Sequence, residues 1–167
     1  LENAGFDDAK IGEVHKVYSA YYWEHCTENT EPYEGVVEFI DWIVSQNAPV
    51  RESRKIAAML TNKPVNPAKK ILEKFGLIGR TTNKISFYLC GDTAPERKPS
   101  PAGIFAILKA TGVAPEKAVM IGDDTPDVMA AKNAGIDCIT LLEGFGRPEN
   151  LLPLEPKYTI GHIKNLL

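Results

Sequence analysis

The sequence predicts an α/β fold in which a parallel β-sheet carries helices on both faces. From about residue 35 onward, short apolar segments alternate with longer segments whose apolar residues recur at helical spacing. This alternation is typical of chains in which each helix connects two parallel strands. Three of the predicted helices also end at a glycine, namely Gly76, Gly112 and Gly135, the residue that most readily adopts the conformation that terminates a helix.

Taken in chain order, the predicted elements differ clearly in apolar spacing. Residues 35–46 form a predicted helix, residues 47–54 a polar loop and residues 56–60 a strand. The alternation continues with helix 67–75, strand 85–90, helix 101–111, strand 119–121, helix 126–134 and strand 137–141. Residues 143–156, with two Gly and three Pro, are predicted to be a surface loop, and a short strand 158–160 and a helix 162–167 close the chain.

The N-terminal segment differs from this pattern. Over residues 7–26, apolar side chains recur at helical spacing and predict one amphipathic helix. We interpret its aromatic stripe as a packing face rather than a ligand-binding set. The side chains are Ile11, Val14, Tyr18 and Tyr21, with Val17, Tyr22 and Trp23 widening the face. Residues 27–32, which end in Glu31-Pro32, are predicted to be a linker to a different unit.

Composition excludes several classes of function. The 167 residues suffice for one domain with a real core, and a net charge of −3 gives no electrostatic case for binding nucleic acid or an acidic membrane. Cys26, Cys90 and Cys138 are widely spaced and are predicted to be reduced thiols. No apolar run reaches the length of a membrane span and no signal sequence is present, so we predict a cytoplasmic protein.

The stretch with the most chemical information follows strand 119–121, whose apolar residues predict that it is fully buried. Gly122 allows a sharp turn, and Asp123 and Asp127 come next, with Asp127 in the first turn of the following helix. Two carboxylates about 4 Å apart repel by roughly 4 kcal/mol at an effective dielectric near 20. A bound cation would offset this repulsion. We predict a Mg²⁺ site, because this ion binds oxygen ligands and keeps waters that a phosphate can replace. The alternative is that the acids only cap a helix in solvent.

Two further groups are predicted to meet these acids at one edge of the sheet. Thr61 and Asn62 follow the strand 56–60, and Lys98 precedes Pro99 in the loop before helix 101–111. In an open parallel sheet, the carboxyl ends of strands and the N-termini of helices face one crevice that favours phosphate. The Thr61 hydroxyl and the Asn62 N–H can donate to phosphate, and Lys98 supplies positive charge. Taken singly, Thr61 could be a turn residue and Lys98 a solvated surface residue.

Three of the helices on this edge are predicted to begin with a polar N-cap followed by Pro at the first helical position. The pairs are Asn66-Pro67, Ser100-Pro101 and Thr125-Pro126.

Together, and in this order, the three signals resemble the second, third and fourth motifs of the haloacid dehalogenase superfamily, and most closely its phosphoglycolate phosphatase branch. The resemblance implies a Rossmann-like core over residues 31–167 and, over residues 1–30, the C-terminal part of a small helical cap. It implies that Thr61 and Lys98 hold the phosphate and that Asp123 ligates Mg²⁺. Asp127 would ligate the ion or its waters, or pair with Lys98.

The family's first motif, a strand ending in Asp-x-Asp-Gly-Thr, is not found in this sequence. The resemblance places that strand in the centre of the sheet, between strands 56–60 and 119–121, where its two acids act as nucleophile and as general acid and base. We expect the sequence to be a fragment of a longer enzyme and to be inactive alone. A degenerate relative and completion by another chain are the alternatives.

The resulting functional hypothesis is a Mg²⁺-dependent phosphatase that hydrolyses a small phosphorylated metabolite, similar to 2-phosphoglycolate, through an aspartyl-phosphate. A sugar-phosphate mutase of the same family and a non-catalytic binding module are the alternatives. A dehalogenase is disfavoured, because its chemistry has no use for a Mg²⁺ carboxylate cluster. The sequence makes no prediction about the oligomeric state.

Overall fold

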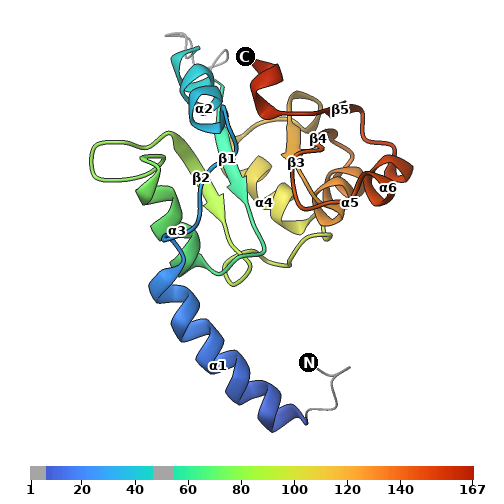
Figure 1. The fold of residues 1–167 in the computed structure, drawn as a ribbon. Helices are drawn as coiled ribbons and strands as arrows, with labels where there is room; N and C mark the ends of the chain where they lie inside the picture. Colours follow the sequence, from blue (N-terminus) through green and yellow to red (C-terminus); the bar gives the residue numbers. More distant parts are fainter. Residues whose placement is uncertain (1–6, 47–54) are drawn as a thin grey trace.

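The structure is a computed structural model that describes residues 7–46 and 55–167. Helices and strands alternate as predicted (Figure 1). The predicted loop over residues 47–54 lies outside the described residues. The helices are α1 (Asp8–His25), α2 (Val36–Ser45), α3 (Val65–Lys74), α4 (Ala102–Thr111), α5 (Thr125–Ala134) and α6 (Pro148–Leu151). The strands are β1 (Ala57–Leu60), β2 (Ile85–Leu89), β3 (Val119–Gly122), β4 (Asp137–Leu141) and β5 (Tyr158–Ile160).

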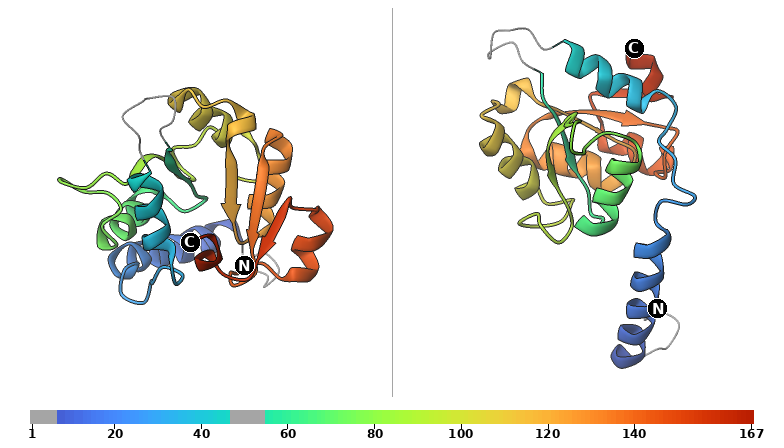
Figure 2. Two further views of the ribbon diagram at one scale, coloured as in Figure 1. Left: turned by 90° about the horizontal axis from the view of Figure 1, so that it is seen from above. Right: turned by 90° about the vertical axis from the view of Figure 1, so that its left-hand side faces the viewer.

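The strands form two parallel sheets rather than one. One sheet pairs β1 with β2, and the other has the order β3-β4-β5. All three strand pairs are parallel, with Leu60 opposite Leu89 and Ile121 opposite Ile139. Helices lie on both sides of these sheets (Figure 2), so the predicted fold class is confirmed.

Within the described residues, the inner edges of β1 and β3 have no strand partner. This gap falls where the family resemblance puts the missing strand. The prediction of a fully buried strand over residues 119–121 is wrong, since Val119 is 49% exposed and Ala58 on β1 is also exposed. A strand with a neighbour on only one side leaves apolar side chains uncovered, which explains the difference.

Packing across the gap comes from helices. Ile104 of α4 and Ala130 of α5 are buried together, and Leu60 of β1 packs against them. Gly103 lies so close to Leu60 that a Cβ atom there would come within 2.7 Å of the Leu60 side chain. These contacts hold the end of β1 near α5, which directly follows β3.

The N-terminal helix α1 projects away from the sheets (Figure 1). Its start is capped by Asp7, whose Oδ1 accepts from the Lys10 N–H at 2.8 Å. No residue of α1 is buried, and Val17, Tyr18 and Tyr21 are 72%, 61% and 65% exposed. The helix was therefore correctly predicted, but Val17, Tyr18 and Tyr21 of its aromatic stripe lie mostly in solvent instead of packing as predicted.

The three predicted helix starts are wrong by one or two residues. Helix α3 begins at Val65 after Pro64, and α4 begins at Ala102 after Pro101. Helix α5 is capped by Asp124, with Thr125 already helical. The Asp124 carboxylate accepts from the Thr125 N–H at 2.7 Å, so the acid one residue earlier caps α5 in place of Thr125.

The C-terminal third contains more structure than predicted. Residues 143–156 were predicted to be a surface loop, but they include α6 and a short 3-10 helix, Leu152–Leu154. Leu151 is fully buried among Val128, Ala131 and Cys138, and burial of this apolar side chain explains why the segment folds back. The predicted closing helix is a 3-10 helix, Ile163–Leu166.

The three cysteines are buried and unpaired, as predicted. In residues 7–46 and 55–167, no helix combines the length and the apolar character needed to span a membrane.

Candidate active site

The polar residues singled out in the sequence meet at the carboxyl ends of β1 and β3. Lys98, from the loop between β2 and α4, connects the two strands. Its Nζ donates to the Leu60 carbonyl at 2.9 Å and lies 2.5 Å from Asp127 Oδ1. The Lys98 and Asp127 side chains are 11% and 8% exposed. One ammonium group therefore touches both the end of β1, next to Thr61, and the helix that follows Asp123.

Asn62 fixes the position of the Lys98 backbone. Its Oδ1 accepts from the Lys98 N–H, and its Nδ2 donates to the Lys98 carbonyl, both at 2.9 Å. A primary amide can make this paired contact because it carries one acceptor and two donors. The loop after β1 and the loop before α4 are thus joined, a role for the Asn62 side chain that the sequence did not suggest.

Thr61 lies at the start of the loop that follows β1. Its N–H donates to the Leu89 carbonyl at 3.0 Å, and its Oγ1 accepts from the Lys63 N–H at 3.2 Å. The hydroxyl proton of Thr61 remains able to donate to another acceptor, since the Lys63 contact uses only a lone pair.

Lys63 also connects this loop to α1. The Lys63 Nζ donates to the Tyr22 hydroxyl and lies 4.7 Å from the centre of the Tyr22 ring. The N-terminal helix therefore contacts the strand end that carries Thr61.

Asp127 is engaged at both carboxylate oxygens. Oδ1 faces Lys98, and Oδ2 accepts from the N–H groups of Asp123 and Asp124 at 3.3 and 3.2 Å. Gly122 permits this arrangement, because a Cβ atom there would come within 2.3 Å of the Asp127 side chain. Of the two roles predicted for Asp127, the geometry favours pairing with Lys98, and direct coordination of a metal stays a prediction.

Asp123 has a different environment. The Tyr33 hydroxyl and the Phe145 N–H both donate to Asp123 Oδ2, each at 3.0 Å. Both donors are neutral, and no cationic side chain of the described residues forms an ion pair with Asp123. Burial, followed by the Asp123 charge and the hydrogen bond to it, raises the pKa of Tyr33 to about 12, so the phenol remains a donor near neutral pH. Among the described residues, Asp123 is thus held by neutral donors alone.

The residues present fit part of a Mg²⁺ site. Asp123 offers a charged carboxylate whose Oδ1 receives no hydrogen bond from the described residues. Those residues contain no cluster of three or more His, Cys, Asp or Glu side chains that could hold a metal. Mg²⁺ commonly uses only one or two carboxylates and completes its shell with waters and phosphate oxygens, so the incomplete set is compatible with this ion.

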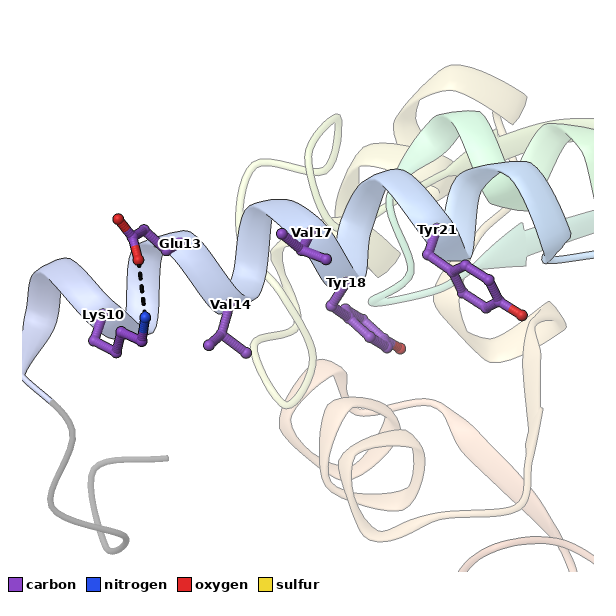
Figure 3. Close-up of a pocket in the computed structure, with 6 residues that line it drawn as sticks. All are labelled: Lys10, Glu13, Val14, Val17, Tyr18 and Tyr21. Atoms are coloured by element: carbon purple, nitrogen blue, oxygen red, sulfur yellow. Dashed lines mark hydrogen bonds and ion pairs between the residues drawn. The ribbon is translucent and has the colours of Figure 1, made fainter.

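A surface hollow lies elsewhere, along α1, and shares no residue with this cluster. Figure 3 shows Val14, Tyr18 and Tyr21 projecting from one side of the helix, with Lys10 and Glu13 joined by an ion pair. It is the exposed face of α1, distinct from the strand ends.

Comparison with known proteins identifies the family. The model of the haloacid dehalogenase-like hydrolases matches residues 2–141. The chain belongs to this family.

Relatives of this chain include proteins named as phosphoglycolate phosphatases. A protein of Pseudomonas savastanoi pv. phaseolicola is 31% identical over 168 residues, which cover 100% of this chain and 57% of the relative. Phosphoglycolate phosphatase 1 of Pseudomonas aeruginosa is 33% identical over 138 residues, which cover 83% of this chain and 47% of that protein. The chain therefore spans about half the length of these curated relatives.

Solved structures share the fold. A protein of Haemophilus somnus, described as a predicted phosphoglycolate phosphatase, has a TM-score of 0.84 at 24% identity. The match covers 96% of this chain and 67% of the Haemophilus somnus chain. A haloacid dehalogenase-like protein of Streptococcus pneumoniae has a TM-score of 0.78 at 20% identity. This match covers 96% of this chain and 70% of the Streptococcus pneumoniae chain. The α/β architecture is thus that of haloacid dehalogenase-like proteins.

Sequence reasoning missed Tyr33 and the turn at Gly144 and Phe145. Tyr33 lies 90 residues before Asp123, in a segment with no periodic pattern, so nothing local connects the two. Gly144 did carry a signal. A glycine often marks a close approach of the backbone to another group, and a Cβ atom at Gly144, three residues after the end of β4, would lie 2.2 Å from Asp123 Oδ2.

Proposed function

We propose that this chain provides the phosphate-binding and metal-binding part of a Mg²⁺-dependent phosphatase that acts on a small phosphorylated metabolite similar to 2-phosphoglycolate. The Lys98 contacts carry the proposal. A single nearly buried ammonium group contacts the Leu60 carbonyl at the end of β1 and Asp127 in the first turn of α5. We therefore expect the strand ends that bear Thr61 and Asp123 to face a common position for an anion. The names of the relatives support the substrate class.

Each residue has a distinct proposed task. The Thr61 hydroxyl and the Asn62 N–H donate to oxygens of the phosphoryl group. Lys98 supplies positive charge that stabilises the charge developing on those oxygens. Asp127 holds Lys98 in place, and Asp123 binds the cation. When bound, Mg²⁺ would add further positive charge next to the transferring group.

The proposed mechanism also needs a nucleophile. We propose an Asp on a strand that pairs with the inner edges of β1 and β3, since these edges have no partner among the described residues. Its carboxylate oxygen bonds to phosphorus as the ester bond breaks, and a second acid protonates the departing oxygen. That acid then takes a proton from the water that releases phosphate.

The proposed domain division follows from the same resemblance. Residues 1–30, which include α1, would be part of a cap over the site, and residues 31–167 the core. The Tyr22 and Lys63 contact supports this arrangement because it joins α1 to the loop that carries Thr61. Caps of this kind exclude water and select substrates. The cytoplasm remains the proposed location.

Phosphate release by the full-length protein tests the proposal. The assay compares 2-phosphoglycolate, a sugar phosphate and an aryl phosphate, each with Mg²⁺ and with a chelator. We expect Mg²⁺-dependent release with the highest kcat/KM for 2-phosphoglycolate. Isomerisation of the sugar phosphate without release of phosphate would favour the mutase alternative. No reaction with any of the compounds would contradict both the phosphatase and the mutase and would favour a binding module.

A further inference from the structure

The Asp123 carboxylate is held from two directions on the same oxygen. The Tyr33 hydroxyl and the Phe145 N–H each donate to Oδ2 at 3.0 Å. Two donors on one oxygen restrict rotation of the carboxylate, and Oδ1 receives no hydrogen bond from the described residues. Gly144 lies against the same side chain, where a Cβ atom would come within 2.2 Å of Oδ2. The carboxylate is therefore fixed with one oxygen available.

The segment that carries Tyr33 is itself anchored to the core on both sides. Before Tyr33, the Lys74 Nζ of α3 donates to the Thr30 carbonyl and to Glu31 Oε1, both at 2.8 Å. After it, Lys164 Nζ pairs with Glu34 Oε2 at 2.7 Å. The segment on either side of Tyr33 is therefore attached to α3 and to the C-terminal 3-10 helix by contacts that do not involve α1.

The two acids of this loop have different kinds of partner. Asp127 pairs with the Lys98 ammonium, whereas Asp123 is held by a phenol and a backbone amide. A cationic partner would cancel the charge that attracts Mg²⁺, but neutral donors orient a carboxylate and leave that charge in place. Hydrogen bonds to ligating carboxylates commonly contribute 10- to 100-fold to metal affinity.

We propose that Tyr33 is a positioning residue that holds Asp123 Oδ1 toward the metal, with the turn at Gly144 and Phe145 as its second support. This inference rests on the metal site of the proposed function. Tyr33 is not a catalytic residue, since it acts through Asp123. A purely structural role for the phenol would change the stability of the protein and leave the affinity for Mg²⁺ as it was.

The test measures Mg²⁺ binding to the full-length protein by isothermal titration calorimetry. Tyr33→Phe removes one hydroxyl and keeps the ring, and Tyr158→Phe is the matched control because Tyr158 is 52% exposed and makes no hydrogen bond to Asp123. We expect Tyr33→Phe to raise the Kd for Mg²⁺ about 10-fold. The control should bind like the parent, and excess Mg²⁺ should restore the kcat of Tyr33→Phe.

A second pair of variants tests the support that Gly144 gives to the Asp123 carboxylate. Gly144→Ala should also raise the Kd, because its methyl group displaces Asp123, whereas Gly79→Ala should not, since no atom lies within 4 Å of the added Cβ. For any variant of lower stability, the difference between its unfolding midpoints with and without Mg²⁺ reports the metal separately from the fold.

The outcomes separate the two proposals. An unchanged Kd in Tyr33→Phe, or a parent protein that binds no Mg²⁺, overturns the role of Tyr33. A raised Kd in a protein that hydrolyses no phosphate ester supports Tyr33 and contradicts the proposed phosphatase function.

Discussion

Lys98 and Asp127 form a nearly buried ion pair, with Nζ and Oδ1 2.5 Å apart and side chains that are 11% and 8% exposed. The pair joins the end of β1 to the first turn of α5, because Lys98 also donates to the Leu60 carbonyl. Removing one member of such a pair leaves an uncompensated charge, which costs far more than the pair itself contributes.

We therefore predict that Asp127→Asn lowers the free energy of unfolding by about 3 kcal/mol. The matched control is Asp137→Asn, which breaks an ion pair with Lys157 of similar length, 2.6 Å, whose side chains are about half exposed. Solvent screens that pair, so the free energy of unfolding of the control should fall by less than about 1 kcal/mol. Urea unfolding measures the free energy of unfolding of both variants. Equal decreases in the two variants would contradict the assigned burial of the ion pair between Lys98 and Asp127.

Asn62 offers a test of how the Lys98 loop is held. Asn62→Ala removes both contacts with the Lys98 backbone, and a small displacement of a positioned group can reduce turnover as much as about 100-fold. We expect a fall in kcat of at least about 10-fold on that ground. Asn66→Ala, an exposed position on α3, is the control and should retain the parent rate. An unchanged kcat in Asn62→Ala would mean that other contacts hold the loop.

The C-terminal 3-10 helix should give the protein an acid-sensitive contact. Glu143 accepts hydrogen bonds from His162 at 2.7 Å and from the Ile163 N–H at 2.8 Å. These two bonds and the charges of His162 and Lys164 lower the pKa of Glu143 from its usual value of 4.5. A carboxyl with a lowered folded pKa contributes stability above its unfolded pKa and loses it as the pH falls through the folded pKa.

Glu143→Gln should therefore reduce the decrease in stability that the parent shows below about pH 4.5. Unfolding midpoints measured between pH 7 and pH 3 check this expectation. Glu149→Gln, at an exposed residue only loosely paired with Arg147 at 4.0 Å, should follow the parent curve. Identical acid profiles for Glu143→Gln and the parent would remove the assigned role of this contact.

Local patterns in the sequence predicted most of the elements, because apolar spacing and glycine stops act within one segment. Strand β4 was predicted over the residues that it occupies, and Thr61, Lys98 and Asp127 were correctly expected at one edge. The absent family motif already implied an unpaired inner edge at β3. The contact between Tyr33 and Asp123 depends on which distant segments meet, and a phenol 90 residues away leaves no local pattern.

The proposed phosphatase function depends on a cation bound by Asp123. Mg²⁺-dependent release of phosphate from an aryl phosphate by the full-length protein measures this role. Asp123→Asn should reduce release by more than about 100-fold, whereas Asp124→Asn should keep near-parent activity because Asn caps a helix as well as Asp does. Activity that survives in Asp123→Asn, or that falls equally in both variants, would contradict the assignment of Asp123 as the residue that binds the cation.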